Sequence, residues 1–207
     1  MTRTRARRTL ENALRRLGFV HVAGVDEVGR GCLAGPVVTA AVILDPDRHI
    51  AGLSDSKQVP APEREELCGC IQRRCIAWAT AAAETDEIDT YNIHQASLRA
   101  MRRAVMALVP LPDLVLVDAF YIPQLFMAQR GVAHGDARCA AIAAASIVAK
   151  VTRDRLMRDL HERDPRYGFD RHKGYATADH LAAVAQFGYS GAHRRSFRPP
   201  SLFDTMA

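Results

Sequence analysis

The sequence predicts an α/β fold with a mixed central β-sheet. Two β-rich segments come first and are separated by a short glycine-rich link, after which strand-like apolar runs alternate with helical segments. Of the 207 residues, 48% are hydrophobic and 25% are charged, a composition that can bury a core and argues against disorder. A chain of this length fits one domain, and we expect residues 1–207 to form it.

The first expected element is a basic helix within residues 1–17, which contain six Arg and one Glu. Leu10, Leu14 and Leu17 recur on one helical face. The segment lacks the apolar run of a secretory signal, and no apolar stretch elsewhere is long enough to cross a bilayer. With an odd count of five cysteines, these features predict a cytoplasmic protein with reduced thiols and no membrane partner.

The other elements follow from hydrophobic periodicity and from the positions of Pro and Gly. Strands are expected at residues 20–28, 36–44, 76–83 and 114–118, with a further edge strand at 130–135. Helices are expected at residues 62–74, 92–108, 140–162 and 177–187.

Charge is distributed unevenly along the chain. Residues 1–17 carry a formal charge of +5, residues 18–145 carry −4 and residues 146–207 carry +4, which together give the net charge of +5. Basic ends around an acidic middle suit a polyanion bound near a carboxylate-rich centre. A distribution that serves only solubility is the alternative.

Two adjacent acids, Asp26 and Glu27, lie near the end of an apolar strand. Buried carboxylates are costly unless they are paired or bind a metal ion. In a regular strand the two would point to opposite faces, so a shared metal site requires a strand end, where the following glycines loosen the geometry. A solvent-facing acidic turn is the alternative.

Two further acids lie at the ends of other elements. Asp118 ends the strand at 114–118, and Asp136 comes shortly before the helix at 140–162. Ligands of open α/β sheets gather at the carboxyl ends of strands, although a loop Asp and a helix-capping Asp explain each residue taken singly. Together with the first pair they form a candidate set for hard divalent ions such as Mg²⁺. Two such ions can assist in-line phosphodiester cleavage.

The link Gly29-Arg30-Gly31 is not a dinucleotide-binding loop. It leads into Pro36 and a β-branched run and not into a helix, so no helix N-terminus is available for a pyrophosphate.

Seven separate stretches of the chain resemble bacterial ribonuclease HII. In order they are GVDEVGRGCLAGPVVTAAVIL, LSDSK, LVLVDA, HGD, AAASIVAKVTRDR, YGFDRHKGYAT and HRRSFRP, spanning roughly residues 20–200. The resemblance implies the ribonuclease H fold, with a mixed five-stranded sheet, flanking helices and a C-terminal helical part over about 165–207 that contacts the substrate. It implies an endonuclease that cuts the RNA strand of RNA–DNA hybrids and cuts 5′ of single ribonucleotides in duplex DNA. The ends would be a 3′-hydroxyl and a 5′-phosphate.

The same resemblance implies the metal site and the partners. Two divalent ions, Mg²⁺ or Mn²⁺, would be held by Asp26, Glu27, Asp118 and Asp136. The partners would be hybrid duplexes and DNA that contains ribonucleotides, and we expect a monomer that acts in ribonucleotide and primer removal.

Substrate contacts are implied as well. Gly29, Arg30 and Gly31 would recognise the ribose 2′-hydroxyl through backbone groups, which glycines allow to come close. Tyr175 would pack on the sugar of the following deoxynucleotide, although a core Tyr is the alternative. Candidate phosphate contacts, each of which is equally explained as a solvated surface charge, are Lys57, Lys150, Arg153, Lys173, Arg194 and Arg195. Asp154 lies four residues after Lys150 and is expected to pair with it.

Four residues depart from the family pattern. Cys32 stands in place of Pro, Ala119 in place of Gly, His134 in place of Lys and Ala176 in place of Pro. Ala119 matters most, because a positive φ there would strain a residue that has a Cβ. His134 removes a fixed positive charge at neutral pH.

Two other functions compete with this interpretation. A junction resolvase or integrase of the same fold would need no sensor of the 2′-hydroxyl. A non-catalytic module that binds hybrids would have no use for four clustered acids, which repel nucleic acid unless a metal is present.

Overall fold

The computed structural model describes residues 6–197. At its centre is a five-stranded sheet of order β3-β2-β1-β4-β5. The strands are β1 (Val22–Val28), β2 (Val37–Ile43), β3 (Ala77–Ala83), β4 (Leu114–Asp118) and β5 (Ala128–Val132). β2 is antiparallel to β1 and β3, whereas β4 is parallel to β1 and β5. The predicted α/β class with a mixed sheet is confirmed.

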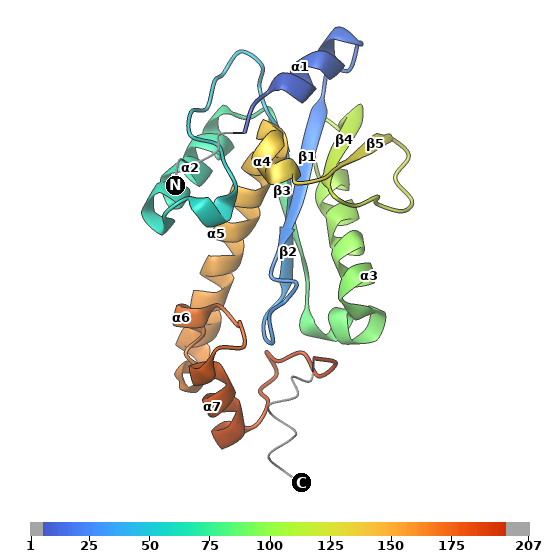
Figure 1. Ribbon diagram of the computed structural model, residues 1–207. Helices are drawn as coiled ribbons and strands as arrows, with labels where there is room; N and C mark the ends of the chain where they lie inside the picture. Colours follow the sequence, from blue (N-terminus) through green and yellow to red (C-terminus); the bar gives the residue numbers. More distant parts are fainter. Residues whose placement is uncertain (1–5, 198–207) are drawn as a thin grey trace.

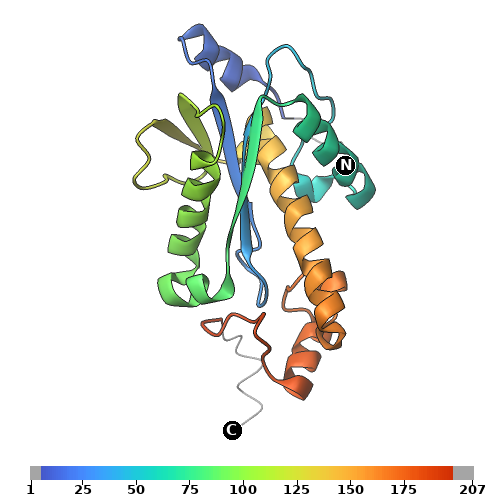
Figure 2. The same ribbon diagram turned by 180° about the vertical axis from the view of Figure 1, so that it is seen from behind.

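Helices cover both faces of this sheet (Figures 1 and 2). They are α1 (Thr9–Arg16), α2 (Ala61–Arg74), α3 (Thr85–Met106), α4 (Gly135–Arg138), α5 (Ala140–Arg163), α6 (Phe169–His172) and α7 (Ala178–Phe187), with 3-10 turns at Ser56–Gln58 and Pro165–Tyr167. Within residues 6–197, no helix is long and apolar enough to span a bilayer.

The two main cores lie on opposite faces of the sheet because successive strand side chains alternate. Val22 and Val42 pack against α5 on one face, and Ala23 and Ile43 pack against α3 on the other. α5 crosses β1 at Gly24, where a Cβ would lie 2.1 Å from the backbone of Ala141. This backbone contact fixes the start of α5, and with it the short helix α4 that carries Asp136.

Some boundaries differ from the predictions. The expected N-terminal helix begins only at Thr9, and residues 1–5 lie outside the described part of the chain. The helix expected from Asn92 begins earlier, at Thr85. Asn92 breaks it with a φ of 65°, and its side chain accepts hydrogen bonds from the amides of His94 and Gln95. A side chain that bonds the following amides is a local helix cap, which explains the prediction.

The predicted edge strand is displaced toward the N-terminus. It ends at Val132 because His134 adopts a left-handed conformation (φ 54°) and the chain then turns into α4. Asp136 therefore belongs to a short helix of its own, not to the loop before α5.

The C-terminal part packs against the end of α5 and against the link between β1 and β2, as Figure 1 shows. Its apolar contacts include Leu33 of the link, Met157 of α5, and Tyr167, Phe169 and Val184. Residues 198–207, the end of the expected C-terminal part, lie outside the described residues.

Candidate active site

The pairing of β1 with β4 brings two of the predicted acids together. Val25 is aligned with Val117 in this parallel register, so the next residues, Asp26 and Asp118, lie side by side where β4 ends. Asp118 Oδ1 accepts a hydrogen bond of 2.8 Å from the Gly135 amide. This bond ties the segment that carries Asp136 to the end of β4.

Asp26 and Glu27 have different surroundings. Asp26 is buried, and its carboxylate accepts a hydrogen bond of 2.8 Å from the Glu27 amide, while the Ser146 side chain of α5 lies close to it and acts to lower its pKa against the larger effect of burial. Glu27 Oε1 lies 3.3 Å from Arg30 Nη1, whereas its Oε2 is buried and has no hydrogen-bond partner among the described residues. Loosened strand geometry was expected at these two acids, but both pair regularly with β2, so the strand continues through them unchanged.

The electrostatics of this cluster leave negative charge unbalanced. Burial raises the pKa of Asp26 well above its usual value, and the neighbouring carboxylates Glu27 and Asp118 raise it further. Burial also raises the pKa of Glu27, against the opposing effect of Arg30. Burial and then the nearby acids Asp55 and Asp118 raise the pKa of Asp136.

These residues fit a hard divalent cation. The donors are carboxylate oxygens, one of them an unpartnered buried oxygen of Glu27, and a cation would offset the charge that raises the pKa values. In residues 6–197, no three acidic, His or Cys side chains already converge as ligands of one ion do.

A β-turn of residues Gly29 to Cys32, here called the ribose turn, follows the acids directly. The Cys32 amide donates to the Gly29 carbonyl at 3.4 Å. Within the described part of the chain, the amides of Arg30 and Gly31 donate to no acceptor. Gly31 is exposed, and a Cβ built on it would meet nothing within 4 Å. The turn thus presents two free N–H groups next to the carboxylates, and the second of them lies at the exposed Gly31.

Comparison with known proteins identifies the family. A family model described as Ribonuclease HII matches residues 23–199. The chain belongs to the ribonuclease HII family. Ribonuclease HII of Nitrosococcus oceani is 56% identical over 182 residues, which cover 88% of this chain and 90% of that protein. The chain is therefore a ribonuclease H, an enzyme that hydrolyses the RNA strand of RNA–DNA hybrids.

Solved structures agree in fold. The ribonuclease H2 from Pyrococcus horikoshii OT3 matches with a TM-score of 0.74 and 24% identity over 89% of this chain and 96% of that one. Bst-RNase HIII in complex with Mn²⁺ matches with a TM-score of 0.69 and 21% identity over 94% of this chain and 71% of that one. At these identities the likeness shows the shared fold.

Two arginines named as phosphate contacts have a different place in the structure. Arg153 and Arg194 are fully buried, and their guanidinium groups donate to backbone carbonyls. Burial lowers the pKa of Arg194 to about 10. A buried guanidinium with these partners does not reach a phosphate at the surface. The predicted phosphate contacts of Arg153 and Arg194 therefore disagree with the structure. An Arg side chain can be buried when backbone carbonyls accept hydrogen bonds from its N–H groups.

The three lysines differ in how free they are. Lys57 is exposed, in the turn beside Asp136. Lys150 lies 2.6 Å from Asp154, the ion pair predicted from their spacing. Lys173 donates to the carbonyl of Asp170 through its ammonium group. Among the described residues, no hydrogen bond or ion pair occupies the ammonium group of Lys57, so of the three it is the most available to a phosphate.

Tyr175 lies at the surface beside the ribose turn. It is 43% exposed, so the alternative of a core Tyr does not apply. Its side chain lies close to Cys32, one of the residues that depart from the family pattern, and burial and then this neighbour raise the pKa of Tyr175. Ala119, the departure of most concern, does adopt a positive φ, 58°.

A pair of serines, not predicted from the sequence, lies behind the acids. The hydroxyls of Ser146 and Ser56 are 2.9 Å apart and buried. Ser56 belongs to the turn that carries Lys57, and Ser146 lies close to the Asp26 carboxylate. No local signal marks either residue, because the contact joins segments 90 residues apart.

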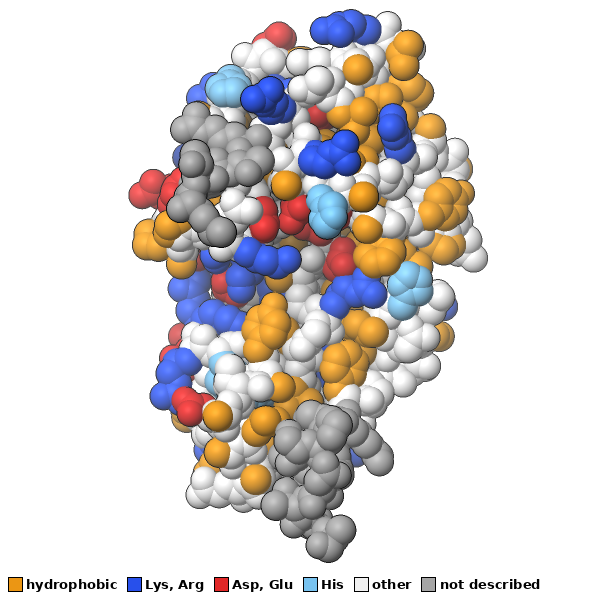
Figure 3. All heavy atoms as spheres, viewed as in Figure 1, with side chains coloured by type: hydrophobic (Ala, Val, Ile, Leu, Met, Phe, Trp, Pro, Cys, Tyr) orange, Lys and Arg blue, Asp and Glu red, His pale blue; other side chains and the backbone are white. Residues whose placement is uncertain are grey.

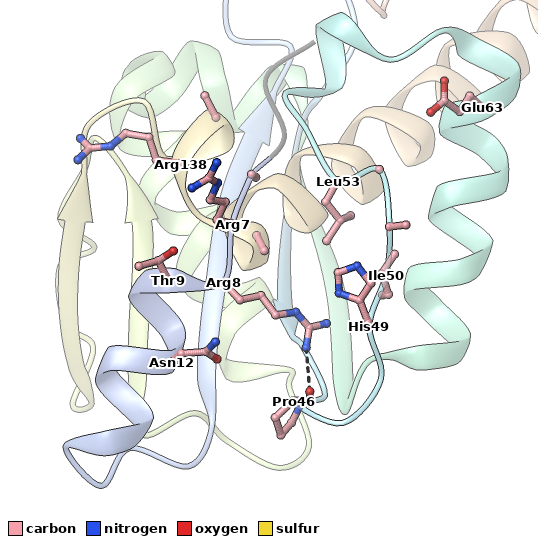
Figure 4. A pocket seen from close by; sticks show the side chains of 15 residues that line it. Arg7, Arg8, Thr9, Asn12, Pro46, His49, Ile50, Leu53, Glu63 and Arg138 are labelled. Carbon is pink, nitrogen blue, oxygen red and sulfur yellow. Dashed lines mark hydrogen bonds between the residues drawn. The ribbon is translucent and has the colours of Figure 1, made fainter. Parts of the chain in front are cut away.

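The surface around the site has the charge arrangement expected of a polyanion-binding face. Figure 3 shows acidic side chains in the middle of this face, with Lys and Arg side chains above and below them. A separate hollow of about 1430 Å³ lies between α1, the loop at residues 46–53 and α4 (Figure 4). Arg8 donates to the Pro46 carbonyl across it at 3.3 Å. None of the four predicted metal-binding acids lines this hollow, so it is distinct from the site.

Proposed function

We propose that this ribonuclease H cleaves on the 5′ side of a ribonucleotide, including a single ribonucleotide embedded in duplex DNA. The observation that carries the proposal is the pair of unbonded amides at Arg30 and Gly31, immediately after the acids Asp26 and Glu27. Two N–H donors suit the oxygen of a 2′-hydroxyl, which distinguishes RNA from DNA. The open space at Gly31 admits the ribose to the backbone.

The proposal also specifies which bond is cut. With the 2′-oxygen bound by the turn, the phosphate on the 5′ side of that ribose faces the carboxylates. Hydrolysis adds water across the bond between phosphorus and the upstream O3′, so the upstream strand ends in a 3′-hydroxyl and the ribonucleotide keeps a 5′-phosphate. The 2′-hydroxyl of that ribose neighbours the phosphate on its 3′ side and not the one that is cut, so water is the attacking group and no cyclic phosphate forms.

Asp26, Glu27, Asp118 and Asp136 are proposed to hold two divalent ions, Mg²⁺ or Mn²⁺. Such ions supply a Lewis acid for the phosphate and lower the pKa of water. The chain contributes the ligand charge, the fixed position of Asp118 against Gly135 and the orientation of Asp26 by the Glu27 amide. The Mn²⁺ bound to Bst-RNase HIII supports a divalent ion in this fold.

Tyr175 is proposed to lie against the sugar that follows the ribonucleotide, and Lys57 to contact a phosphate. Exposure of both side chains beside the ribose turn and the acids supports this. We further infer one catalytic unit that includes the C-terminal part and acts as a monomer in the cytoplasm, where its five free thiols stay reduced. Removal of ribonucleotides and RNA primers from DNA is the matching cellular role.

The test uses a duplex DNA with one ribonucleotide, incubated with and without Mg²⁺ or Mn²⁺. We expect cleavage only with metal, with the ribonucleotide at the 5′ end of the downstream fragment. A 2′,3′-cyclic phosphate, or a cut on the 3′ side of the ribonucleotide, would overturn the proposal.

A pair of glycine variants separates ribose recognition from folding. Gly31→Ala adds a methyl group in the open space where the ribose is proposed to lie. Gly191→Ala adds the same group at a site that also has nothing within 4 Å and no positive φ, outside the ribose turn. We expect Gly31→Ala to fold normally and to lose at least about 100-fold in kcat/KM, while Gly191→Ala keeps wild-type activity. Equal activities of the two variants would contradict the proposal that the ribose lies against Gly31.

A further inference from the structure

The ribose turn is held from behind by one buried side chain. Arg194 is fully buried, and its Nη2 donates to the Gly29 carbonyl (2.6 Å) while its Nη1 donates to the Arg30 carbonyl (2.8 Å). The same guanidinium donates twice to the Gly35 carbonyl, at 3.0 and 2.8 Å. Arg194 thus binds both ends of the link between β1 and β2.

These two carbonyls belong to the same peptide units as the two free amides. In a trans peptide, the C=O and the N–H of the next residue point in opposite directions. A carbonyl of Gly29 turned inward to Arg194 therefore turns the Arg30 N–H outward. The carbonyl of Arg30 does the same for the Gly31 N–H. The direction of both proposed ribose donors is set by hydrogen bonds on the other side of the backbone.

Without that constraint the turn has a second conformation within reach. The central peptide of a β-turn can flip between types I and II, and type II needs a positive φ at the third residue, which glycine accepts. Gly31 occupies that position, and its φ is not positive here. A flip would reverse the Gly31 N–H and remove it from the ribose, so the same glycine that admits the substrate leaves the peptide free to turn.

A second buried arginine joins the ribose turn to Tyr175. Arg153 of α5 donates to the carbonyls of Ala34 (3.1 Å), Pro36 (2.9 Å) and Lys173 (2.8 Å). A Cβ on Gly29 would lie 2.1 Å from Arg153 Nε, so Gly29 has to be a glycine for this side chain to fit. Lys173 is two residues before Tyr175, and the two recognition elements are therefore connected through one guanidinium.

We propose that Arg194 is a positioning residue that holds the peptide planes of the ribose turn so that the Arg30 and Gly31 amides face the 2′-hydroxyl, with Arg153 fixing the distance to Tyr175. This inference rests on the proposed function of the turn. It assigns the proposed recognition of RNA by this chain in part to a buried side chain that lies behind the turn.

The test compares Arg194→Lys with the wild-type protein. Lysine keeps the positive charge, but its single nitrogen cannot span the carbonyls of Gly29, Arg30 and Gly35. Binding is measured by fluorescence anisotropy, in Ca²⁺, to two duplexes that differ by one 2′-hydroxyl. Two hydrogen bonds predict a wild-type preference of about tenfold for the ribonucleotide duplex. We expect the variant to lose most of this preference while its affinity for the all-DNA duplex is unchanged.

Arg64→Lys is the matched control. Arg64 is also largely buried and also donates to two backbone carbonyls, those of Ser56 and Val59, away from the ribose turn. It is expected to keep the wild-type preference. A general loosening of the fold would lower affinity for both duplexes in either variant, whereas loss of positioning changes only the preference in Arg194→Lys.

The amide signals of Arg30 and Gly31 in NMR spectra of the free proteins test the positioning without any substrate. We expect them to shift or double in Arg194→Lys and to stay in place in Arg64→Lys. If the wild type shows no preference between the duplexes, the proposed function fails, and the NMR signals still decide whether Arg194 holds the turn.

A milder variant covers the possibility that Arg194→Lys does not fold. Phe197→Leu removes the ring over which the Arg194 guanidinium lies, 5.0 Å from its centroid, and keeps the arginine. A smaller displacement of the same two amide signals, with a smaller loss of preference, is expected. Unchanged signals and an unchanged preference in a folded variant would overturn the inference.

Discussion

Glu11 of α1 caps the long helix α5: its Oε1 accepts a hydrogen bond of 2.8 Å from the Ala141 amide. The same oxygen lies 3.3 Å from the Cys139 thiol, and the Glu11 side chain is fully buried. A carboxylate at this end of a helix binds free N–H groups and interacts well with the helix dipole. Described residues of the basic N-terminal segment are therefore packed against the helix that follows Asp136.

Replacing Glu11 is expected to destabilise the protein. Glu11→Ala removes the cap and should lower the free energy of unfolding by about 1–2 kcal/mol, whereas Glu11→Gln keeps an acceptor and should cost less. Urea denaturation measures both. Asn12→Ala, at the exposed neighbouring position, is the control and should change stability by under about 0.5 kcal/mol. Glu11→Ala with wild-type stability would contradict the capping role.

Loss of one proposed metal ligand is expected to abolish cleavage without unfolding. Asp118→Asn removes a charge that the cations require, but its remaining oxygen can still accept from the Gly135 amide. Mn²⁺ affinity, measured by calorimetry, should fall together with activity. Asp113→Asn changes the acid just before the other end of β4, which accepts from the Val20 and His21 amides, and should leave both unchanged. Normal Mn²⁺ binding by Asp118→Asn would contradict the ligand assignment.

Tyr175→Ala is expected to affect substrates unequally. Loss should be greater, by about tenfold, on a single ribonucleotide in DNA than on a long RNA strand paired with DNA, because only the first always places a deoxyribose next to the cut. Tyr91 is the matched control, since it is also 43% exposed and lies elsewhere on the surface. The kinetics of Tyr175→Ala and Tyr91→Ala are measured on both substrates. If Tyr175→Ala lowers activity equally on the two substrates, Tyr175 does not recognise the deoxyribose.

Acid is expected to weaken the C-terminal part through His193. His193 Nδ1 accepts from the Ser190 amide (3.0 Å), so the neutral ring carries its proton on Nε2, 3.0 Å from His180 Nε2. Burial and then the neighbouring His180 lower the pKa of His193 from 6.5 to about 4. Between these values the unfolded chain binds the proton and the folded one does not. The free energy of unfolding should therefore fall on acidification, by at most about 1.4 kcal/mol per pH unit.

Urea unfolding from pH 7.5 to 4.5 measures this effect. The stability advantage of the wild type over His193→Gln should shrink as the pH drops below 6.5. The advantage over His49→Gln, which changes an exposed histidine, should stay constant. An advantage over His193→Gln that does not change with pH would rule out His193 as the group that titrates.

Ala119→Gly is expected to stabilise the protein. Ala119 has a φ of 58°, a conformation that costs an L-residue roughly 1–2 kcal/mol and glycine nothing. After the larger entropy of unfolded glycine is subtracted, a gain of about 0.5–1 kcal/mol remains. Ala133→Gly is the control, because Ala133 has no positive φ and should lose stability. Thermal unfolding distinguishes a gain from a loss.

Local sequence determined the elements and most of the proposed site. The apolar run 114–118 predicts β4 with Asp118 at its end, and the run before Asp26 predicts β1. Both predictions succeed because the pattern of apolar residues along a short segment indicates which side chains are buried. The resemblance supplied the grouping of the four acids. The sequence predicted a helix that begins at Asn92 but not the helical residues before it, and it did not indicate that the edge strand stops at Val132, because backbone conformation at single residues decides both.

Only the tertiary structure decided what the buried charged groups do. Arg153 and Arg194 look like surface cations in the sequence, but the fold places them behind the ribose turn. Most of the carbonyls that satisfy their donors lie between 117 and 165 residues away along the chain, and Arg153 also donates to the Lys173 carbonyl, 20 residues away. Glu11 caps a helix 130 residues distant. A charged side chain can be buried only where the folded chain brings it partners, and such partners are set by contacts between distant segments. Sequence patterns describe the neighbours of a residue along the chain, whereas most of the partners of these buried residues come from segments that are distant in sequence.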